Sequence, residues 1–199
     1  MRRNHPYQYR QRGMSLIVVL MLLAITMVLG IGAIQLSLMG EKSARNDRDY
    51  QIAWQASEAG LMDAEFDIDA KDAATSTRSS TFTTGNALAF LDGCGTSGTS
   101  KGLCLPASSG KPVWLSVDLA STSSAAVVYG TFTNRSFDAG NSGLKPKQAP
   151  QYIIELIEDT AARGDASIGR EQKYVYRITS MGFGPRSDIQ AVTQSIFRK

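Results

Sequence analysis

Few side chains in this chain are of the types that catalysis uses. The only histidine is His5, so no later histidine can complete a Ser-His-Asp or Cys-His arrangement. Gly182-Phe183-Gly184 lacks the third glycine and the following helix of a phosphate-binding loop. Four aspartates lie close together in the sequence: Asp63, Asp67, Asp69 and Asp72. We interpret them as the solvated face of a helix, not as an acid/base pair, and expect neither an enzyme nor a cofactor.

A long apolar stretch follows a basic start. Residues 14–39 carry no charge, whereas four arginines lie in the first twelve positions. As a helix, this stretch would reach roughly 39 Å at about 1.5 Å per residue, enough to cross a bilayer core of about 30 Å. Because excess Lys and Arg on a short flank stay in the cytoplasm, we expect everything after Gly40 to lie outside it. The formal charge of +3 therefore reflects the arginines that set the orientation in the membrane. It does not indicate a nucleic-acid-binding surface, and we expect no nucleic acid as a partner.

Cys94 and Cys104 enclose a loop rich in Ser, Thr and Gly. In a domain outside the cytoplasm, this pair favours one disulfide, with a stabilisation of roughly 3 kcal/mol by the loop-closure model. A metal site is the alternative. Zinc would have to depend on two thiolates and distant carboxylates, since the only histidine is His5. We therefore expect a disulfide and no metal.

The apolar helix is predicted to continue into a second, amphipathic half. Residues 51–70 place their polar side chains on one narrow stripe, which is typical of a helix packed on most sides. Two helices with a hinge near Gly40 are the alternative. Three later segments are rich in β-branched and aromatic residues and predict strands: Gln151 to Ile157, Lys173 to Phe183 and Asp188 to Phe197. A weaker strand candidate is Ala125 to Phe132, which follows Pro112-Val113-Trp114-Leu115.

The junction Gln11-Arg12-Gly13-Met14-Ser15-Leu16-Ile17 resembles a prepilin leader. The order of basic leader, glycine, long helix, cysteine-closed region and C-terminal strands is similar to type IV pilins. More narrowly, several motifs resemble the minor pilins of the PilX class. They are Arg48-x-x-x-x-Ala53-x-x-Ala56-x-Glu58-Ala59, Gly102-Leu103-Cys104, Pro112-Val113-Trp114, and Tyr176-Arg177-Ile178-Thr179-Ser180-x-Gly182 with Ala191-Val192-x-Gln194-Ser195.

This resemblance implies an α+β, type IV pilin-like fold. A long N-terminal helix, with a transmembrane half and an amphipathic half, would pack on a C-terminal antiparallel sheet of three to four strands. The implied organisation is a prepilin leader over residues 1–13, a transmembrane half over 14–39, an amphipathic half over 40–72 and a globular head over 73–199. In the family, a dedicated peptidase cuts after the leader glycine, here Gly13, and the new first residue, here Met14, is N-methylated.

One position departs from the family pattern. Major pilins carry Glu as the fifth residue after the cut, and this chain has Val18 there. In the filament, the carboxylate is thought to pair with the N-terminal amine of the neighbouring subunit, which offsets the cost of a buried charge. Val18 offers no such partner. We therefore expect a rare subunit, at the pilus tip or in a priming complex.

The resemblance implies a minor pilin of type IV pilus assembly, held by one span in the bacterial inner membrane with its head in the periplasm, and later part of the pilus. Implied partners are other minor pilins, the major pilin, the prepilin peptidase and the inner-membrane assembly platform. Two alternatives remain open. One is a minor pseudopilin of a type II secretion system, and the other is a signal-anchored periplasmic binding domain or enzyme.

Overall fold

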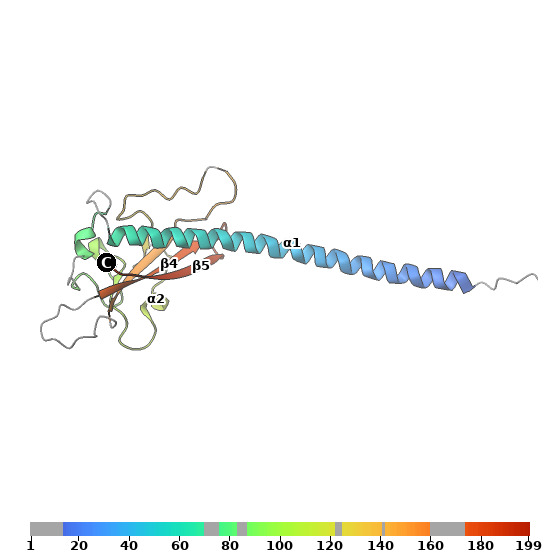
Figure 1. The fold of residues 1–199 in the computed structure, drawn as a ribbon, viewed down its shortest axis with the longest axis horizontal. Coiled ribbons are helices and arrows are strands. Elements are labelled where there is room, and N and C mark those ends of the chain that lie inside the picture. The colour runs from blue at the N-terminus through green and yellow to red at the C-terminus, as the bar shows by residue number, and fades with distance from the viewer. Residues whose placement is uncertain (1–13, 70–75, 83–86, 122–124, 141, 160–173) are drawn as a thin grey trace, which may run out of the picture. The chain divides into compact units, whose positions relative to one another are not determined.

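The computed structural model describes residues 14–69, 76–82, 87–121, 125–140, 142–159 and 174–199 (Figure 1). The chain divides into two compact units between Asn46 and Asp47. We call residues 14–46 the N-terminal segment and the described residues from Asp47 onward the head. The sequence-predicted leader over residues 1–13 lies outside the described residues.

Helix α1 extends from Met14 to Ile68. It continues through Gly40, as the single-helix interpretation predicted, and the alternative with a hinge at this glycine is wrong. In the N-terminal segment, apolar side chains such as Leu29 and Leu36 are exposed. Among the described helices, α1 alone is long and apolar enough to cross a membrane. Residues 70–72, which the sequence assigned to its end, lie outside the described part of the chain.

The head contains a five-stranded mixed sheet. Its strands are β1 (Leu103–Cys104), β2 (Val127–Val128), β3 (Gln151–Glu158), β4 (Tyr174–Phe183) and β5 (Gln190–Phe197). Their order is β1-β3-β4-β5, and β2 pairs with β3. The pairings β2·β3, β3·β4 and β4·β5 are antiparallel, whereas β1 runs parallel to β3. The α+β, pilin-like fold is thus confirmed, and the short β1 makes its sheet mixed instead of purely antiparallel.

The three strong strand predictions are confirmed within two residues at each end. The weaker candidate forms only the two residues of β2, because the chain turns at Gly130, which has a φ of +78°. The segment after Pro112 forms the short helix α2 (Val113–Ser116). Pro112 immediately precedes this helix, where its missing N–H leaves no helical hydrogen bond unmade.

Strand β3 is buried on both faces, so the head has two apolar clusters. On one face, Tyr152 and Ile154 pack with Ile178 and with Leu61, Ala64 and Ile68 of α1. On the other face, Ile153 packs with Val113, Leu119 and the two cysteines. The sheet is therefore covered by α1 on one side and by the segment containing α2 on the other.

The head part of α1 approaches β4 very closely. A Cβ atom added at Gly182 would lie 2.1 Å from the backbone nitrogen of Ser57 and 2.2 Å from the carbonyl oxygen of Ala53. Beside this contact, the hydroxyls of Ser57 and Thr193 are 2.6 Å apart, and the Ser57 hydroxyl also donates to the carbonyl of Ser180. Small residues on both elements therefore set the distance between helix and sheet.

Candidate functional site

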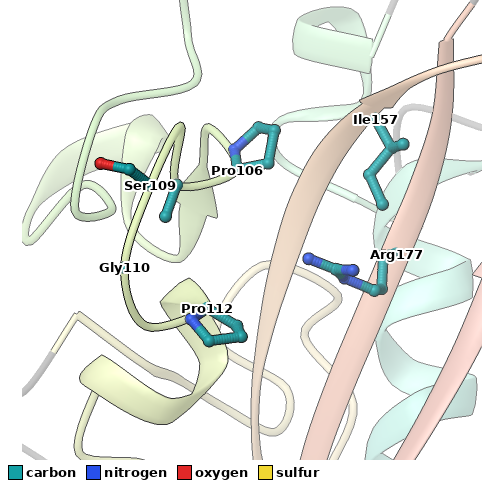
Figure 2. Close-up of a pocket in the computed structure, with 7 residues that line it drawn as sticks. Pro106, Ser109, Gly110, Pro112, Ile157 and Arg177 are labelled. Atoms are coloured by element: carbon teal, nitrogen blue, oxygen red, sulfur yellow. The ribbon is translucent and has the colours of Figure 1, made fainter.

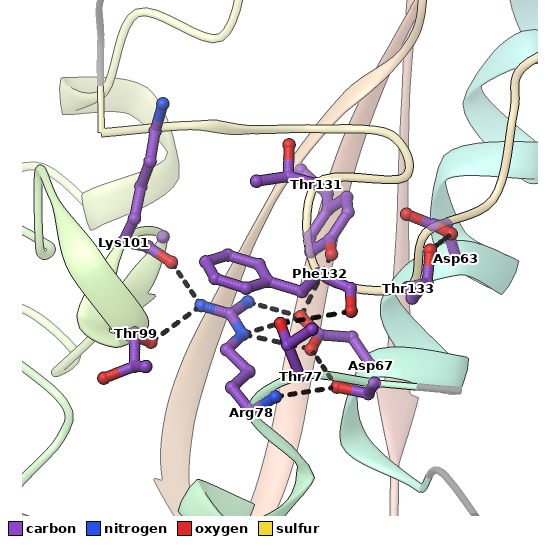
Figure 3. Close-up of polar contacts among 12 residues, drawn as sticks. Asp63, Asp67, Thr77, Arg78, Thr99, Lys101, Thr131, Phe132 and Thr133 are labelled. Atoms are coloured by element: carbon purple, nitrogen blue, oxygen red, sulfur yellow. Dashed lines mark hydrogen bonds and ion pairs between the residues drawn. The ribbon is translucent and has the colours of Figure 1, made fainter. Parts of the chain in front are cut away.

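The last turns of α1 carry a buried polar cluster (Figure 3). Its members are Asp67 on α1, Ser76 and Arg78 in the following connection, and Tyr152 on β3, and we call them the helix-end cluster. All four are buried. Arg78 is among the largest side chains that are completely enclosed, so its charge needs compensation within the fold.

Asp67 provides that compensation. The Arg78 Nε donates to both carboxylate oxygens, at 3.0 and 2.9 Å, and Nη2 donates to Oδ2 as well. The Ser76 hydroxyl donates to Oδ1 at 3.1 Å, and the Tyr152 hydroxyl donates to Oδ2 at 3.0 Å. A buried ion pair is tolerated when further hydrogen bonds satisfy its oxygens, and here the helix, the connection and the sheet all contribute.

The other side of Arg78 holds the loop between the cysteines. Its Nη1 donates to the carbonyls of Thr99 at 3.0 Å and of Lys101 at 2.5 Å. The guanidinium also lies 3.7 Å from the ring centroid of Phe132, a cation–π contact visible in Figure 3. Arg78 therefore ties the C-terminal end of α1 to the cysteine loop and to the segment after β2.

A second carboxylate on α1 holds that segment one turn earlier. Asp63 accepts the backbone N–H of Gly130 at 2.8 Å and the hydroxyl of Thr133. Burial raises the pKa of this carboxyl, and the two hydrogen bonds lower it only in part. In the helix-end cluster, burial and then the charge of Asp67 raise the pKa of Tyr152 well above 10.0, so its hydroxyl keeps the proton that it donates.

The prediction of a solvated acidic face is wrong for Asp63 and Asp67, which are both fully buried. Asp69 is exposed as predicted, and Asp72 lies outside the described residues. The signal was present in the spacing, since Asp63 and Asp67 follow Gly60 at intervals of three and four on the buried face. The interpretation considered the charge of each aspartate by itself. It therefore missed that Asp63 and Asp67 lie on the buried face, and it missed Arg78 as the ion-pair partner of Asp67.

Cys94 and Cys104 form a disulfide with a Cα–Cα distance of 4.1 Å. The enclosed loop is ordered by its own hydrogen bonds, including one from the N–H of Gly102 to the carbonyl of Gly95 at 3.0 Å. It contains a short 3-10 helix over Gly98–Ser100. The disulfide and Arg78 thus hold this loop at two separate places.

These contacts are typical of a rigid structural scaffold and not of a catalytic site. The Asp67 carboxylate and the Arg78 guanidinium are fully enclosed and hydrogen-bonded to protein groups, so a ligand could reach them only if the cluster opened. Within the part of the chain that the structure describes, no group of three or more His, Cys, Asp or Glu side chains could hold a metal ion.

A pocket of about 310 Å³ lies on the other face of the sheet (Figure 2). Arg177 points into it between Pro106, Pro112 and Ile157. The guanidinium donates to both oxygens of the buried Glu155, at 2.9 and 2.7 Å. Its charge is therefore neutralised within the fold, and apart from Ser109 the remaining lining residues are proline, alanine, glycine and isoleucine.

The features that the resemblance placed at the N-terminus are only partly described. Gly13 precedes the described residues, and Met14 is the first residue of α1. Val18 lies on α1 with its side chain exposed. In the head, α1 also leaves four large apolar side chains exposed: Tyr50, Trp54, Met62 and Phe66.

A long apolar helix whose second half packs on a mixed sheet defines an α+β protein of the type IV pilin-like class. Two family models agree with this assignment. The model described as type IV pilus assembly protein PilX C-term matches residues 100–199, and the PilX N-terminal model matches residues 12–61. The chain belongs to the PilX family, whose members are structural components of the type IV pilus that interact with other pilins. Comparison with curated proteins and with solved structures gave no match.

Proposed function

We propose that this minor pilin acts in a priming or tip complex with other minor pilins, from which a type IV pilus is assembled. The observation that carries the proposal is Val18. It leaves the apolar half of α1 without a carboxylate to receive the N-terminal amine of a neighbouring subunit. A subunit of this kind is poorly suited to repeated addition along a filament, and well suited to one defined position.

The N-terminal processing belongs to this proposal. Arginines before Gly13 keep the leader in the cytoplasm, where the peptidase acts, and the head lies in the periplasm. Cleavage would leave Met14 as a methylated first residue at the start of α1. Mass spectrometry should then find a methylated chain that begins at Met14, and Gly13→Val should abolish this product. Recovery of full-length chain alone from wild-type cells would contradict the processing.

The exposed apolar side chains of α1 support an assembly role. In the N-terminal segment they suit lipid before assembly and neighbouring helices afterwards. In the head, Trp54 and Met62 remain about half exposed, with values of 46% and 54%. A helix that leaves several large apolar side chains exposed favours a role in interaction with other proteins. Other minor pilins, the major pilin and the assembly platform are the proposed partners.

Deletion and Val18→Glu together test the proposal. Without the protein, surface pili and twitching should fall strongly, while major pilin is still made and processed. Wild-type protein should be far scarcer than major pilin in sheared filaments. Val18→Glu should change where or how often the subunit is incorporated, without changing cleavage at Gly13. Normal piliation in the deletion strain would overturn the assembly role, and loss of protein secretion alone would favour a pseudopilin.

A further inference from the structure

Strand β5 is the edge of the sheet and has a free outer side. Among the residues that the structure describes, the only strand that pairs with Gln190–Phe197 is β4. Figure 1 shows β4 and β5 side by side next to the head part of α1. An eight-residue edge strand presents unpaired N–H and C=O groups to the surroundings, and proteins normally protect such an edge.

The usual protections are missing from β5. Its eight residues include no proline and no charged side chain. The charges on either side of it are already engaged within the head. Asp188 pairs with Arg186, Arg198 pairs with Asp159, and Lys199 donates to the carbonyl of Ile68 at 3.0 Å. The strand Gln190–Phe197 itself carries no charge along its whole length.

The face of β5 that points away from α1 is uncharged and exposed, and it alternates glutamines with the apolar Val192 and Ile196. Register places Gln194 beside Thr179, and Thr179 beside Ile153 of the second apolar cluster. Val192 and Ile196 share that face, with exposed fractions of 44% and 68%. Val192 pairs with Met181, which packs against the same cluster. Val192 thus adjoins the second apolar cluster through Met181, whereas Ile196 lies beside Arg177, which is paired with Glu155. Nothing described covers either apolar side chain.

We propose that the outer edge of β5 accepts an extended, uncharged segment of another pilus subunit, which joins the sheet as a further strand. Backbone hydrogen bonds supply the affinity in this mode of recognition, and alternate side chains supply the specificity. Next to Val192 and Ile196, the added segment carries apolar side chains, because cross-strand neighbours on one face contact each other. A charged segment would gain no ion pair at this neutral edge and would lose solvation.

The choice of another subunit as partner rests on the proposed function. A subunit that occupies one position in a complex meets mostly subunits of other kinds. A second copy of this chain and a segment of the same chain are the competing occupants, and both are outcomes of the test.

The test uses the full chain, expressed at its native level together with the other pilus proteins. The double variant Val192→Lys, Ile196→Lys introduces the charges that natural edges use against strand addition. The matched control is Leu115→Lys, Leu144→Lys, whose side chains are similarly exposed, at 56% and 51%, but lie off the sheet. The edge variant should lower co-purification of identified pilus subunits about tenfold or more, and the control should not. Equal yields in both variants would overturn the proposal.

A photo-crosslinking residue at position 196 gives a second measurement that does not depend on the folding of the lysine variant. The expected product joins position 196 to an uncharged segment of another pilus subunit with alternating apolar residues. Crosslinks only to a second copy, only within the chain, or none at all would overturn it. If deletion abolishes pili but the edge variant restores them fully, the edge inference fails and the proposed function stands. If deletion leaves piliation normal, the proposed function itself fails.

Discussion

Arg78 and Asp67 form an ion pair whose side chains are both completely buried, although Asp67 lies in α1 and Arg78 lies eleven positions further along the chain. The pair joins α1 to the segment that contains Arg78, and the same guanidinium also donates to two carbonyls of the disulfide loop. Burial of such a pair costs the solvation free energy of both charges, but removal of one partner destabilises the fold even more. Removal of one partner leaves a charge without compensation.

Arg78→Met should therefore destabilise the head by about 3–5 kcal/mol. Arg186→Met is the matched control, because Arg186 and Asp188 form an exposed ion pair, whose loss should cost about 1 kcal/mol or less. Denaturant unfolding of both variants in detergent measures the difference. The double variant Arg78→Met, Asp67→Leu should be less damaged than the sum of the two single variants, since neither charge is then left alone. Equal losses for Arg78→Met and Arg186→Met would contradict the ion pair's role.

Gly182→Ala should destabilise the head, because the new methyl group would meet the backbone of α1 at Ser57 and Ala53. Backbone atoms cannot swing away as side chains do, so the helix must move. Overpacking of this kind typically costs about 1–3 kcal/mol. For a domain of this size, the melting temperature should fall by roughly 3–10 °C. Gly40→Ala is the control, since nothing lies within 4 Å of its Cβ position.

Gly60→Ala offers a contrast, because its methyl group would meet the side-chain oxygen of Ser180 at 2.2 Å. Here the addition of Ser180→Ala should restore much of the lost stability. A melting temperature of Gly182→Ala equal to wild type would show that α1 and β4 are farther apart than the structure has them.

Asp63 should make the head relatively more stable in acid. Burial raises the pKa of its carboxyl in the folded state, so the folded protein holds this proton more tightly than the unfolded chain. The stabilisation is complete below the unfolded pKa of about 3.9 and is lost as pH rises through the folded pKa. The unfolding free energy of wild type minus that of Asp63→Asn should therefore decrease from pH 3 to neutral pH. A difference that grows with pH would mean that hydrogen bonds from Gly130 and Thr133 outweigh burial.

Cys94 and Cys104 should be unreactive toward alkylation in unfolded protein that has not been reduced. The head lies, by our proposal, in an oxidising compartment. Cys94→Ala with Cys104→Ala should cost about 3 kcal/mol, mainly through the greater freedom of the unfolded chain. Labelling of both cysteines before reduction would refute the disulfide in the native protein.

Local sequence patterns were sufficient to predict the long helix, the three long strands and the pairing of the two cysteines. The uncharged run after Gly13 makes a helix long enough for a bilayer, whatever the rest of the chain does. Dense β-branched and aromatic residues define β3, β4 and β5, because each strand's own residues favour extended backbone. Cys94 and Cys104 are the only cysteines in the chain, which leaves one intramolecular pairing.

Only the tertiary structure determined which charged side chains are buried and which strand forms the edge of the sheet. Asp67 becomes a buried partner because Arg78 and Tyr152 reach it from other elements, and no local rule reports a contact across 85 residues. The parallel pairing of β1 with β3 likewise depends on where the disulfide loop folds back. The free edge of β5 follows from strand order alone, since the residues of an edge strand and of a central strand can share the same local pattern.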